Sequence, residues 1–507
     1  METIKKTAIV IMIITILSKV TGFLRDITLS YFYGASSISD AYIVSITISS
    51  VLFSLIIAGI STAYIPLYKN IEYNVSRFAA VKFTNNLINI VLIITTIIII
   101  IGLAFSNLLV KVFAFGFDGD TLEVAVLFTR IGIVGIYFTS LTQLLVNYLQ
   151  LNGKFVIPAM IGFPFNLIII LSIYISTHTD IIVLAIGSVL AALFQLIFLF
   201  PSLLKAKFRY STTVQFNDPH IKKMSFIVFP IMIGISIDQI NLMIDKTLAS
   251  TIVEGGISAL TYASRLNDFV QGIFVLSFVT VMFPVISNLV AQKNIADFKN
   301  SISGVISSVV LVVVPASVGI MVLSQPIIRL LFGHGNFDEQ AIHMTSQALF
   351  YYCVGMIGYA IREVLNRTFY SLQDSKTPMF NAALAVVLNI VLNFVLSHYM
   401  GLKGLALATS ISALFCSFLL ALNLRKKIGP FGIKDNVITF LKVIFASCVM
   451  GIVIYAIEKY TLISWNPLLK MSAIIITGGL IYFLLITTLK VKESKLLIQF
   501  IRRKIHL

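Results

Sequence analysis

Charge is scarce in this sequence: charged residues make up 11% of its 507 residues, whereas hydrophobic residues make up 58%. Soluble globular domains carry about 25% charged residues, so this composition does not supply a water-soluble surface. Apolar runs of the roughly 20 residues that a helix needs to cross a bilayer recur from one end of the chain to the other. We therefore predict a membrane domain throughout, with no soluble catalytic domain.

Cysteine is also rare, and Cys353, Cys416 and Cys448 are far apart in the chain. Their spacing excludes a cysteine-based metal motif, so we interpret them as small packing residues. No P-loop sequence is present, so direct ATP coupling is not expected. A membrane glycosyltransferase or polymerase would need paired acids on a large loop, and the one close pair, Asp118 and Asp120, is better interpreted as a turn.

Fourteen apolar segments are predicted to cross the membrane as helices. They cover residues 6–31, 40–66, 79–106, 122–150, 156–176, 180–204, 221–250, 257–289, 301–323, 343–370, 378–398, 402–425, 435–457 and 465–489. The first segment resembles a secretory signal, but no small-residue cleavage pattern follows it, so we expect an uncleaved helix.

The net charge of +16 is better explained by topology than by nucleic acid, which we do not expect as a partner. With the N-terminus in the cytoplasm, the cytoplasmic loops and tails hold about 24 Lys and Arg, and the opposite loops about 4. We predict a multi-pass membrane protein with both termini cytoplasmic. Attraction to anionic lipid headgroups accounts for the basic segments. The largest of these contain Lys205, Lys207, Arg209, Lys222, Lys223, Arg425, Lys426, Lys427, Arg502, Arg503 and Lys504.

Two parts of the chain echo one another at an offset of about 220 residues. Ala63-Tyr64-Ile65-Pro66 is echoed by Val281-Met282-Phe283-Pro284, and Tyr148-Leu149-Gln150 by Ser371-Leu372-Gln373. Because six spans per repeat is an even number, the halves would share an orientation and be related by a pseudo-two-fold axis along the membrane normal. We predict an all-α fold with six-helix bundles in 1–210 and 211–430, followed by two additional helices and a basic tail in 431–507.

Charged side chains inside the predicted spans are the candidates for a functional site, because a charge in hydrocarbon needs a wet cavity or a partner. In the first span, Lys19 and Arg25 are six residues apart and would approach one cavity if the helix breaks at Gly22. Asp40 opens the second span. An alternative is that Arg25 and Asp26 form an interfacial ion pair.

Arg265 and Asp268, at i and i+3 in the eighth span, share a helix face. If the halves pair across the axis, Arg25 and Arg265 would face each other over a cavity and bind an anion, for which the planar guanidinium suits phosphate oxygens. In the tenth span, Arg367 is a further cavity candidate. Arg362 and Glu363 also add charge there, but the alternative is that these two side chains only pair with each other and have a structural role.

Oxygen-bearing side chains form a second group of candidates. Asp238 and Asp245 are seven residues apart and share a face of the seventh span, Asn389 and Asn393 are four apart in the eleventh, and Thr409 lies in the twelfth. Such oxygens suit a hard cation such as sodium, or a protonation site. The alternative is that the asparagines and the threonine only form hydrogen bonds between neighbouring helices.

Several stretches resemble the MurJ/MviN lipid II flippase family of the multidrug/oligosaccharidyl-lipid/polysaccharide exporter superfamily. These stretches are Ser18-Lys19-Val20-Thr21-Gly22-Phe23-Leu24-Arg25-Asp26, Gly34-Ala35 with Asp40-Ala41, Tyr262-Ala263-Ser264-Arg265-Leu266-Asn267-Asp268-Phe269, Leu331-Phe332-Gly333-His334-Gly335 and Phe369-Tyr370-Ser371-Leu372-Gln373-Asp374-Ser375-Lys376-Thr377-Pro378. They extend from the first predicted span to the eleventh.

The resemblance implies a transporter and not an enzyme. Its substrate would be the undecaprenyl-pyrophosphate-linked peptidoglycan precursor, lipid II, moved to the outer leaflet by alternating access for cell-wall synthesis. Association with peptidoglycan synthesis proteins is also implied. The positions that match the family's cavity are Lys19, Arg25, Asp26, Asp40, Arg265 and Asp268, to which we add Arg367.

The resemblance also implies a lipid-tail groove in the last two spans and a possible sodium site formed by Asp245, Asn389, Asn393 and Thr409, with no other cofactor. Asn393 stands where the family has an acid. The second span reads Val51-Leu52-Phe53-Ser54-Leu55 where family members often have arginines. The cargo could therefore be another polyprenyl-linked glycan. A cation-coupled drug exporter is a weaker alternative, because such a protein needs an acidic and aromatic cavity.

Overall fold

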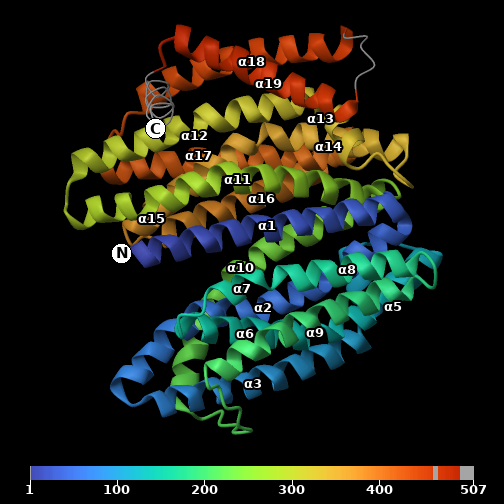
Figure 1. Cartoon of the computed structure of the whole chain (residues 1–507), viewed down its shortest axis with the longest axis vertical. Helices are drawn as coiled ribbons and strands as arrows, with labels where there is room; N and C mark the ends of the chain where they lie inside the picture. The colour runs from blue at the N-terminus through green and yellow to red at the C-terminus, as the bar shows by residue number, and fades with distance from the viewer. Residues whose placement is uncertain (1, 461–465, 492–507) are drawn as a thin grey trace. The chain divides into compact units, whose positions relative to one another are not determined.

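The structure is a computed structural model that describes residues 2–460 and 466–491, and in this part of the chain all regular structure is helical (Figure 1). The first ten helices are α1 (Glu2–Tyr33), α2 (Ser37–Asn74), α3 (Arg77–Ala104), α4 (Ser106–Phe113), α5 (Gly119–Val134), α6 (Ile136–Leu151), α7 (Val156–Met160), α8 (Gly162–Ser176), α9 (Ile182–Lys205) and α10 (Pro219–Ile252). The others are α11 (Gly256–Ala291), α12 (Ile295–Val322), α13 (Ser324–Leu331), α14 (Glu339–Val354), α15 (Met356–Ser371), α16 (Lys376–Met400), α17 (Leu402–Ile428), α18 (Ile433–Tyr460) and α19 (Pro467–Thr488).

Each predicted span coincides with one helix or with two consecutive helices. Within the described residues, 10 helical segments are long and apolar enough to cross a membrane, and the count rises to 12 if each of two bent pairs is one span. One bend, of 47°, lies within α10, and the other, of 44°, separates α14 from α15. Helices α1 and α11, with 32 and 36 residues, occupy two further predicted spans. The basic tail containing Arg502, Arg503 and Lys504 lies outside the described residues.

The succession of helices is duplicated at the offset of about 220 residues expected from the sequence echoes. Helices α3 and α12 each have 28 residues, and α5, α6, α14 and α15 each have 16. One duplicated feature has no counterpart among the predicted spans: the eight-residue helices α4 and α13, which carry a basic residue in the last turn, Lys111 and Arg329. Eight residues are too few to cross a bilayer, which is why a search for long apolar runs overlooks them.

The described chain forms two compact units: unit 1 contains residues 1–258 and 335–338, and unit 2 contains residues 259–334 and 339–507. Helix α10 belongs to unit 1, where it packs on α2. The boundary between the compact units therefore follows Ser258. The boundary predicted from the sequence repeat lies between residues 210 and 211, where the duplicated order of helices begins again.

Asparagine side chains of α3 bind the basic loop between α9 and α10 in unit 1. The amide nitrogen of Asn85 donates to the carbonyl of Arg209 at 2.9 Å, and that of Asn89 donates to the carbonyls of Ser211 and Thr213, each at 2.9 Å. Asn86 both donates to the carbonyl of Gln215 and accepts from its backbone N–H. These buried amides satisfy the backbone of a loop that has no secondary structure of its own.

In unit 2, α18 and α19 lie side by side next to α12 (Figure 1). The buried hydroxyl of Tyr482 in α19 donates to the carbonyl of Leu311 in α12 at 2.7 Å. Gly478 lets α19 approach α18, because a Cβ at this position would lie 2.5 Å from the Ile454 side chain. The two C-terminal spans are therefore attached to the body of unit 2 by close packing.

The asparagine contacts predict the behaviour of the α9–α10 loop. Replacing Asn86 and Asn89 together with alanine removes the contacts to Ser211, Thr213 and Gln215, so trypsin should cleave after Lys207 or Arg209 several-fold faster. The measurement is the rate of appearance of the two fragments from the purified protein. Asn107→Ala, at an exposed position of α4, is the control and should cleave like the wild type. Equal rates in the double variant and the control would contradict the assignment.

Candidate functional site

Arg25 of α1 has hydrogen-bonded partners for all three of its guanidinium nitrogens. Its Nε and Nη2 donate to the same oxygen of Asp26 at 3.0 and 2.8 Å, and its Nη1 donates to the amide oxygen of Asn166 in α8 at 3.3 Å. The Arg25 and Asp26 side chains are 23% and 14% exposed. The ion pair that the sequence left open as an alternative is thus present, and it neutralises the guanidinium within its own helix.

Close packing of α1 on α7 and α8 brings Asn166 to this position. A Cβ on Gly162 would lie 2.0 Å from the hydroxyl oxygen of Ser18, so a larger residue here would force this side chain to move. The amide nitrogen of Asn166 donates to the hydroxyl of Thr21 at 3.1 Å. The signal for this contact in the sequence is a single asparagine, Asn166, within an apolar run, and it is absent from the predicted site residues.

A break at Gly22 was the condition under which Lys19 and Arg25 would approach one cavity, and this condition is not met, because α1 runs without interruption from Glu2 to Tyr33. Gly22 instead faces Asn166, whose amide nitrogen would lie 3.6 Å from an added Cβ. On an unbroken helix, Lys19 and Arg25 are separated by roughly 120° around the axis. Lys19 is exposed, whereas Arg25 is partly buried, so the helix does not present both cations on one face.

Asp40 of α2 binds the first turn of α11. Its carboxylate accepts the backbone N–H of Ser258 at 2.7 Å and also the Ser258 hydroxyl, and both residues are buried. A carboxylate at a helix N-terminus satisfies amides that have no partner inside the helix and interacts favourably with the helix dipole. Asp40 therefore acts here as a helix cap, and its predicted contact with a substrate stays a prediction.

Glycines in the left-handed conformation bring three segments of unit 1 together beside Asp40. Gly34, Gly255 and Gly335 have φ angles of 60°, 76° and 65°. An added Cβ would lie 2.3 Å from the carbonyl oxygen of Asn336, 2.2 Å from that of Ala35 and 2.2 Å from that of Tyr31, respectively. No larger side chain fits at these distances, so the three glycines define a junction of the ends of α1 and α10 with residues 335–338.

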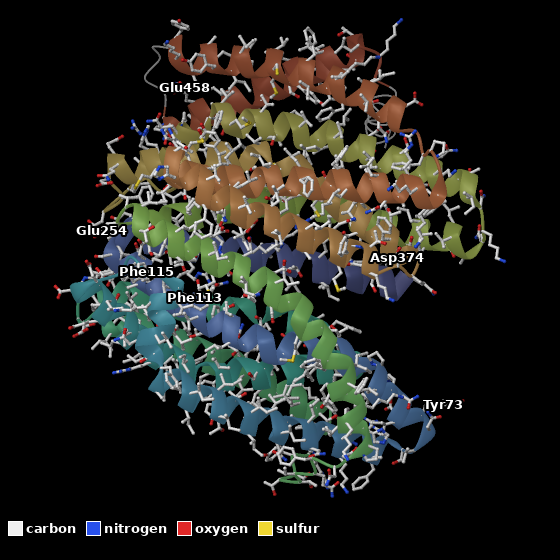
Figure 2. All side chains as sticks on the ribbon, turned by 180° about the vertical axis from the view of Figure 1, so that it is seen from behind. Tyr73, Phe113, Phe115, Glu254, Asp374 and Glu458 are labelled. Atoms are coloured by element: carbon white, nitrogen blue, oxygen red, sulfur yellow. The ribbon has the colours of Figure 1, made fainter. Side chains whose placement is uncertain are left out.

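Asn336 fastens the same junction with two hydrogen bonds to the end of α1. Its backbone N–H donates to the carbonyl of Tyr31 at 2.9 Å, and its side-chain amide donates to the carbonyl of Phe32 at 2.6 Å. On the other side, Glu254, labelled in Figure 2, accepts the backbone N–H of Ser37 at 3.1 Å. These contacts join segments that are far apart in the sequence, which a single sequence does not reveal.

Arg367 of α15 has Glu363 as its partner, at 3.1 Å and one helical turn away. Glu363 thus forms its ion pair with Arg367 and not with Arg362, whose guanidinium lies 4.7 Å from the centre of the Tyr359 ring. The guanidinium of Arg367 also lies 5.8 Å from the centre of the Phe283 ring. Because its side chain is 43% exposed, Arg367 keeps an accessible face in unit 2.

Arg265 and Asp268 are both exposed on α11 and belong to unit 2, whereas Arg25 belongs to unit 1. The prediction that Arg25 and Arg265 face each other across a cavity therefore concerns residues of two separate units, and it stays a prediction.

Part of the predicted sodium group lies together inside unit 2. The amide nitrogen of Asn393 donates to the amide oxygen of Asn389 at 2.9 Å, and the Asn389 nitrogen donates to the Thr409 hydroxyl at 3.5 Å. Asn389 and Asn393 are buried, and these bonds join α16 to α17 as the structural alternative expects. Asp238 and Asp245 belong to α10 in unit 1. Among the described residues there is no group of three or more His, Cys, Asp or Glu side chains that could hold a metal ion.

The junction beside Asp40 gives a direct prediction. The starting protein carries Cys448→Ser, because Cys448 is the one exposed cysteine. A reporter cysteine is then introduced next to Gly255 by Ala35→Cys. Adding Asp40→Ala removes both acceptor contacts to Ser258 and should raise the maleimide reaction rate of the reporter several-fold, because a hydrogen bond to a charged group is worth about 1.5–3 kcal/mol. Asp118→Ala, at an exposed position, should leave the rate unchanged. An unchanged rate with Asp40→Ala would show that this carboxylate does not hold the junction.

The apolar helices, the duplicated order and the paired charges inside helices define a multi-pass membrane transporter. The family model for "Lipid II flippase MurJ" matches residues 29–476, and the chain belongs to this family. A relative from Vibrio cholerae serotype O1, named "Probable lipid II flippase MurJ", is 29% identical over 493 residues, which cover 93% of both chains.

Solved structures agree with this placement. A structure titled "Lipid II flippase MurJ, inward closed conformation" has a TM-score of 0.83 and 28% identity, covering 96% of this chain and 100% of that one. A multidrug resistance MATE family transporter of the MOP superfamily, in an inward-facing conformation, has a TM-score of 0.70 with 16% identity, covering 83% and 98%. The second likeness shows a shared fold only.

Proposed function

We propose that this chain moves lipid II, the undecaprenyl-pyrophosphate-linked peptidoglycan precursor, from the inner to the outer leaflet of the bacterial cell membrane. The observation that carries this proposal is the match to the lipid II flippase family over residues 29–476, together with the similarity to a MurJ structure over 96% of the chain. Such a protein is a transporter and not an enzyme: its work is a change of conformation, and no covalent bond is made or broken.

The pyrophosphate is the part of the cargo that arginine recognises. A guanidinium binds phosphate oxygens through parallel N–H donors, but in this structure Asp26 accepts two of the donors of Arg25. The proposed mode of binding is that the phosphate replaces Asp26 on Arg25. Arg265 and Arg367, which belong to unit 2, stay further cations predicted from the sequence. After release, Asp26 pairs with Arg25 again, so the empty protein does not keep an unpaired buried cation.

The flippase proposal is tested by complementation of a bacterial cell depleted of its own lipid II flippase. The wild-type chain should restore growth and the accessibility of lipid II on the outer face, and Arg25→Ala or Arg265→Ala should reduce that accessibility at least tenfold at equal membrane levels. Arg25→Lys should be intermediate, because an ammonium lacks the planar fork. Arg329→Ala is the control, since Arg329 is half exposed and pairs with Glu339.

Full rescue by both alanine variants would refute the role of these arginines without refuting the flippase. Failure of the wild-type chain, with rescue of a capsule or another glycan pathway, would assign the protein to another polyprenyl-linked cargo. The absence of arginine in the second-span sequence Val51-Leu52-Phe53-Ser54-Leu55 is the observation that favours this second candidate. A drug exporter would instead change resistance to cationic drugs.

The asymmetry of basic loops supports an orientation with both termini in the cytoplasm of a bacterial inner membrane. In this orientation the Asp40 junction lies on the outer face, because α1 begins on the cytoplasmic side. The two C-terminal helices α18 and α19 are proposed to receive the lipid tail, since they expose Ile452, Ile476, Leu480 and Leu484. Association with peptidoglycan synthesis proteins is part of the proposal and follows from the cargo.

Sodium is proposed as the coupling ion. Asn389, Asn393 and Thr409 supply buried amide and hydroxyl oxygens of the kind that a hard cation takes. These residues would hold the ion, and a role for Asp245, which lies in unit 1, stays a prediction from the sequence. A bound ion that favours one conformation shifts the population toward it.

Sodium binding predicts a thermal effect that does not depend on transport. Sodium chloride should raise the unfolding midpoint of the purified wild-type protein relative to potassium chloride, because a ligand that binds only the folded state stabilises it. The shift should disappear in Asn393→Leu, which keeps the branched shape at Cγ and removes the oxygen. Equal midpoints of the wild type in the two salts would exclude a sodium site at these concentrations.

A further inference from the structure

A surface pocket of about 670 Å³ lies where α15, α16 and α17 of unit 2 meet. Three lysines line it, Lys376 at the start of α16 and Lys426 and Lys427 at the end of α17. Because these positions are the ends of two apolar helices long enough to cross a membrane, the pocket lies at the level where hydrocarbon gives way to headgroups and water. We call it the lysine pocket.

The charge of the lysine pocket is positive after its own ion pair is counted. Asp374, labelled in Figure 2, accepts from Lys427 at 2.6 Å and from the backbone N–H and hydroxyl of Thr377 at 3.0 and 2.8 Å. The hydrogen bond from Lys427 is the main cause that lowers the pKa of Asp374 to about 2. Asp374 therefore stays ionised at neutral pH and neutralises one lysine, while Lys376 and Lys426 remain exposed.

A buried amide in the same pocket lacks a hydrogen-bond acceptor. Asn381 of α16 is 2% exposed, and its side-chain oxygen accepts from Asn423 of α17 at 3.1 Å. Its side-chain nitrogen has no hydrogen-bond partner within the described chain. An unsatisfied buried donor is unfavourable, and beside three lysines it is suited to an oxygen of an anionic ligand.

The apolar side of the pocket continues into the membrane-facing surface of α16. Phe380, Leu384 and Leu419 line the pocket, and beyond it α16 exposes Val387, Val391 and Phe394. The spacing of three or four residues from Phe380 to Phe394 places these side chains on one helix face. A ligand whose phosphate contacts the lysines can therefore place hydrocarbon chains on the adjoining apolar face of α16.

We propose that the lysine pocket binds the phosphate headgroup of an anionic membrane glycerophospholipid, whose acyl chains lie along the exposed face of α16. Basic pockets between transmembrane helices have the charge that anionic headgroups require. The phosphate oxygens accept from Lys376, Lys426 and the Asn381 amide, while Lys427 keeps its pair with Asp374. A free phosphate would leave the apolar side of the pocket without a partner, and this argues for a lipid.

The test is the affinity of the purified full chain for phosphatidylglycerol, measured by native mass spectrometry in detergent, with phosphatidylcholine as the zwitterionic comparison. The wild type should bind one phosphatidylglycerol in preference to phosphatidylcholine. Lys376→Ala with Lys426→Ala should weaken that binding at least tenfold, since each basic residue near anionic lipid contributes to the attraction. The matched control removes two other exposed lysines, Lys222→Ala with Lys223→Ala, and should bind like the wild type.

A second variant tests the amide. Asn381→Asp keeps the oxygen that Asn423 contacts and replaces the donor with a carboxylate oxygen, so it should also weaken phosphatidylglycerol binding about tenfold with little change in shape. Equal affinities of the wild type, the lysine variant and Asn381→Asp would overturn the proposal. Equal binding of both lipids by the wild type would also overturn it, as would displacement of phosphatidylglycerol by millimolar inorganic phosphate. None of these outcomes depends on whether the chain transports lipid II.

Discussion

The pairing of Arg25 with Asp26 and Asn166 is the interaction on which this account depends. A charge within a hydrophobic span is strongly unfavourable unless a partner or water compensates it, and here the neighbouring carboxylate and an amide of α8 supply that compensation. The pair explains how a hydrophobic helix that contains a partly buried arginine is stable without cargo. In the proposed mode of binding, an anionic cargo competes with Asp26 for the two donors that this carboxylate accepts.

Around this pair, unit 1 is held by close approaches that only small residues permit. Gly162 brings α8 to α1, and Gly34, Gly255 and Gly335 bring three chain segments to one junction, where Asp40 binds the first turn of α11. Packing of small residues is the usual way for helices to associate in a membrane, where burial of apolar side chains gives little driving force. Because the carboxylate of Asp40 is a charged acceptor at this junction, its few hydrogen bonds contribute much of the stability of the junction.

Much of the fold was predictable from the sequence, because a transmembrane helix needs a long apolar run and little else. All fourteen predicted spans coincide with helices. The repeat offset recurs in the positions of α3 and α12, which also have the same length. The partners of the charges were not predictable in the same way. Asp40 meets Ser258 and Arg25 meets Asn166 across more than a hundred residues of sequence, and the short helices α4 and α13 carry no long apolar signal. Gly22 does not break α1, which passes through it as one continuous helix beside Asn166.

The most direct test of the account is the affinity of purified Asp26→Asn for lipid II, compared with that of the wild type at equal ionic strength. If the phosphate has to replace Asp26 on Arg25, a neutral amide competes less well, and the variant should bind lipid II several-fold more tightly. Weaker or unchanged binding by a correctly folded Asp26→Asn protein would contradict the exchange of partners on Arg25 and, with it, the proposed mode of cargo recognition.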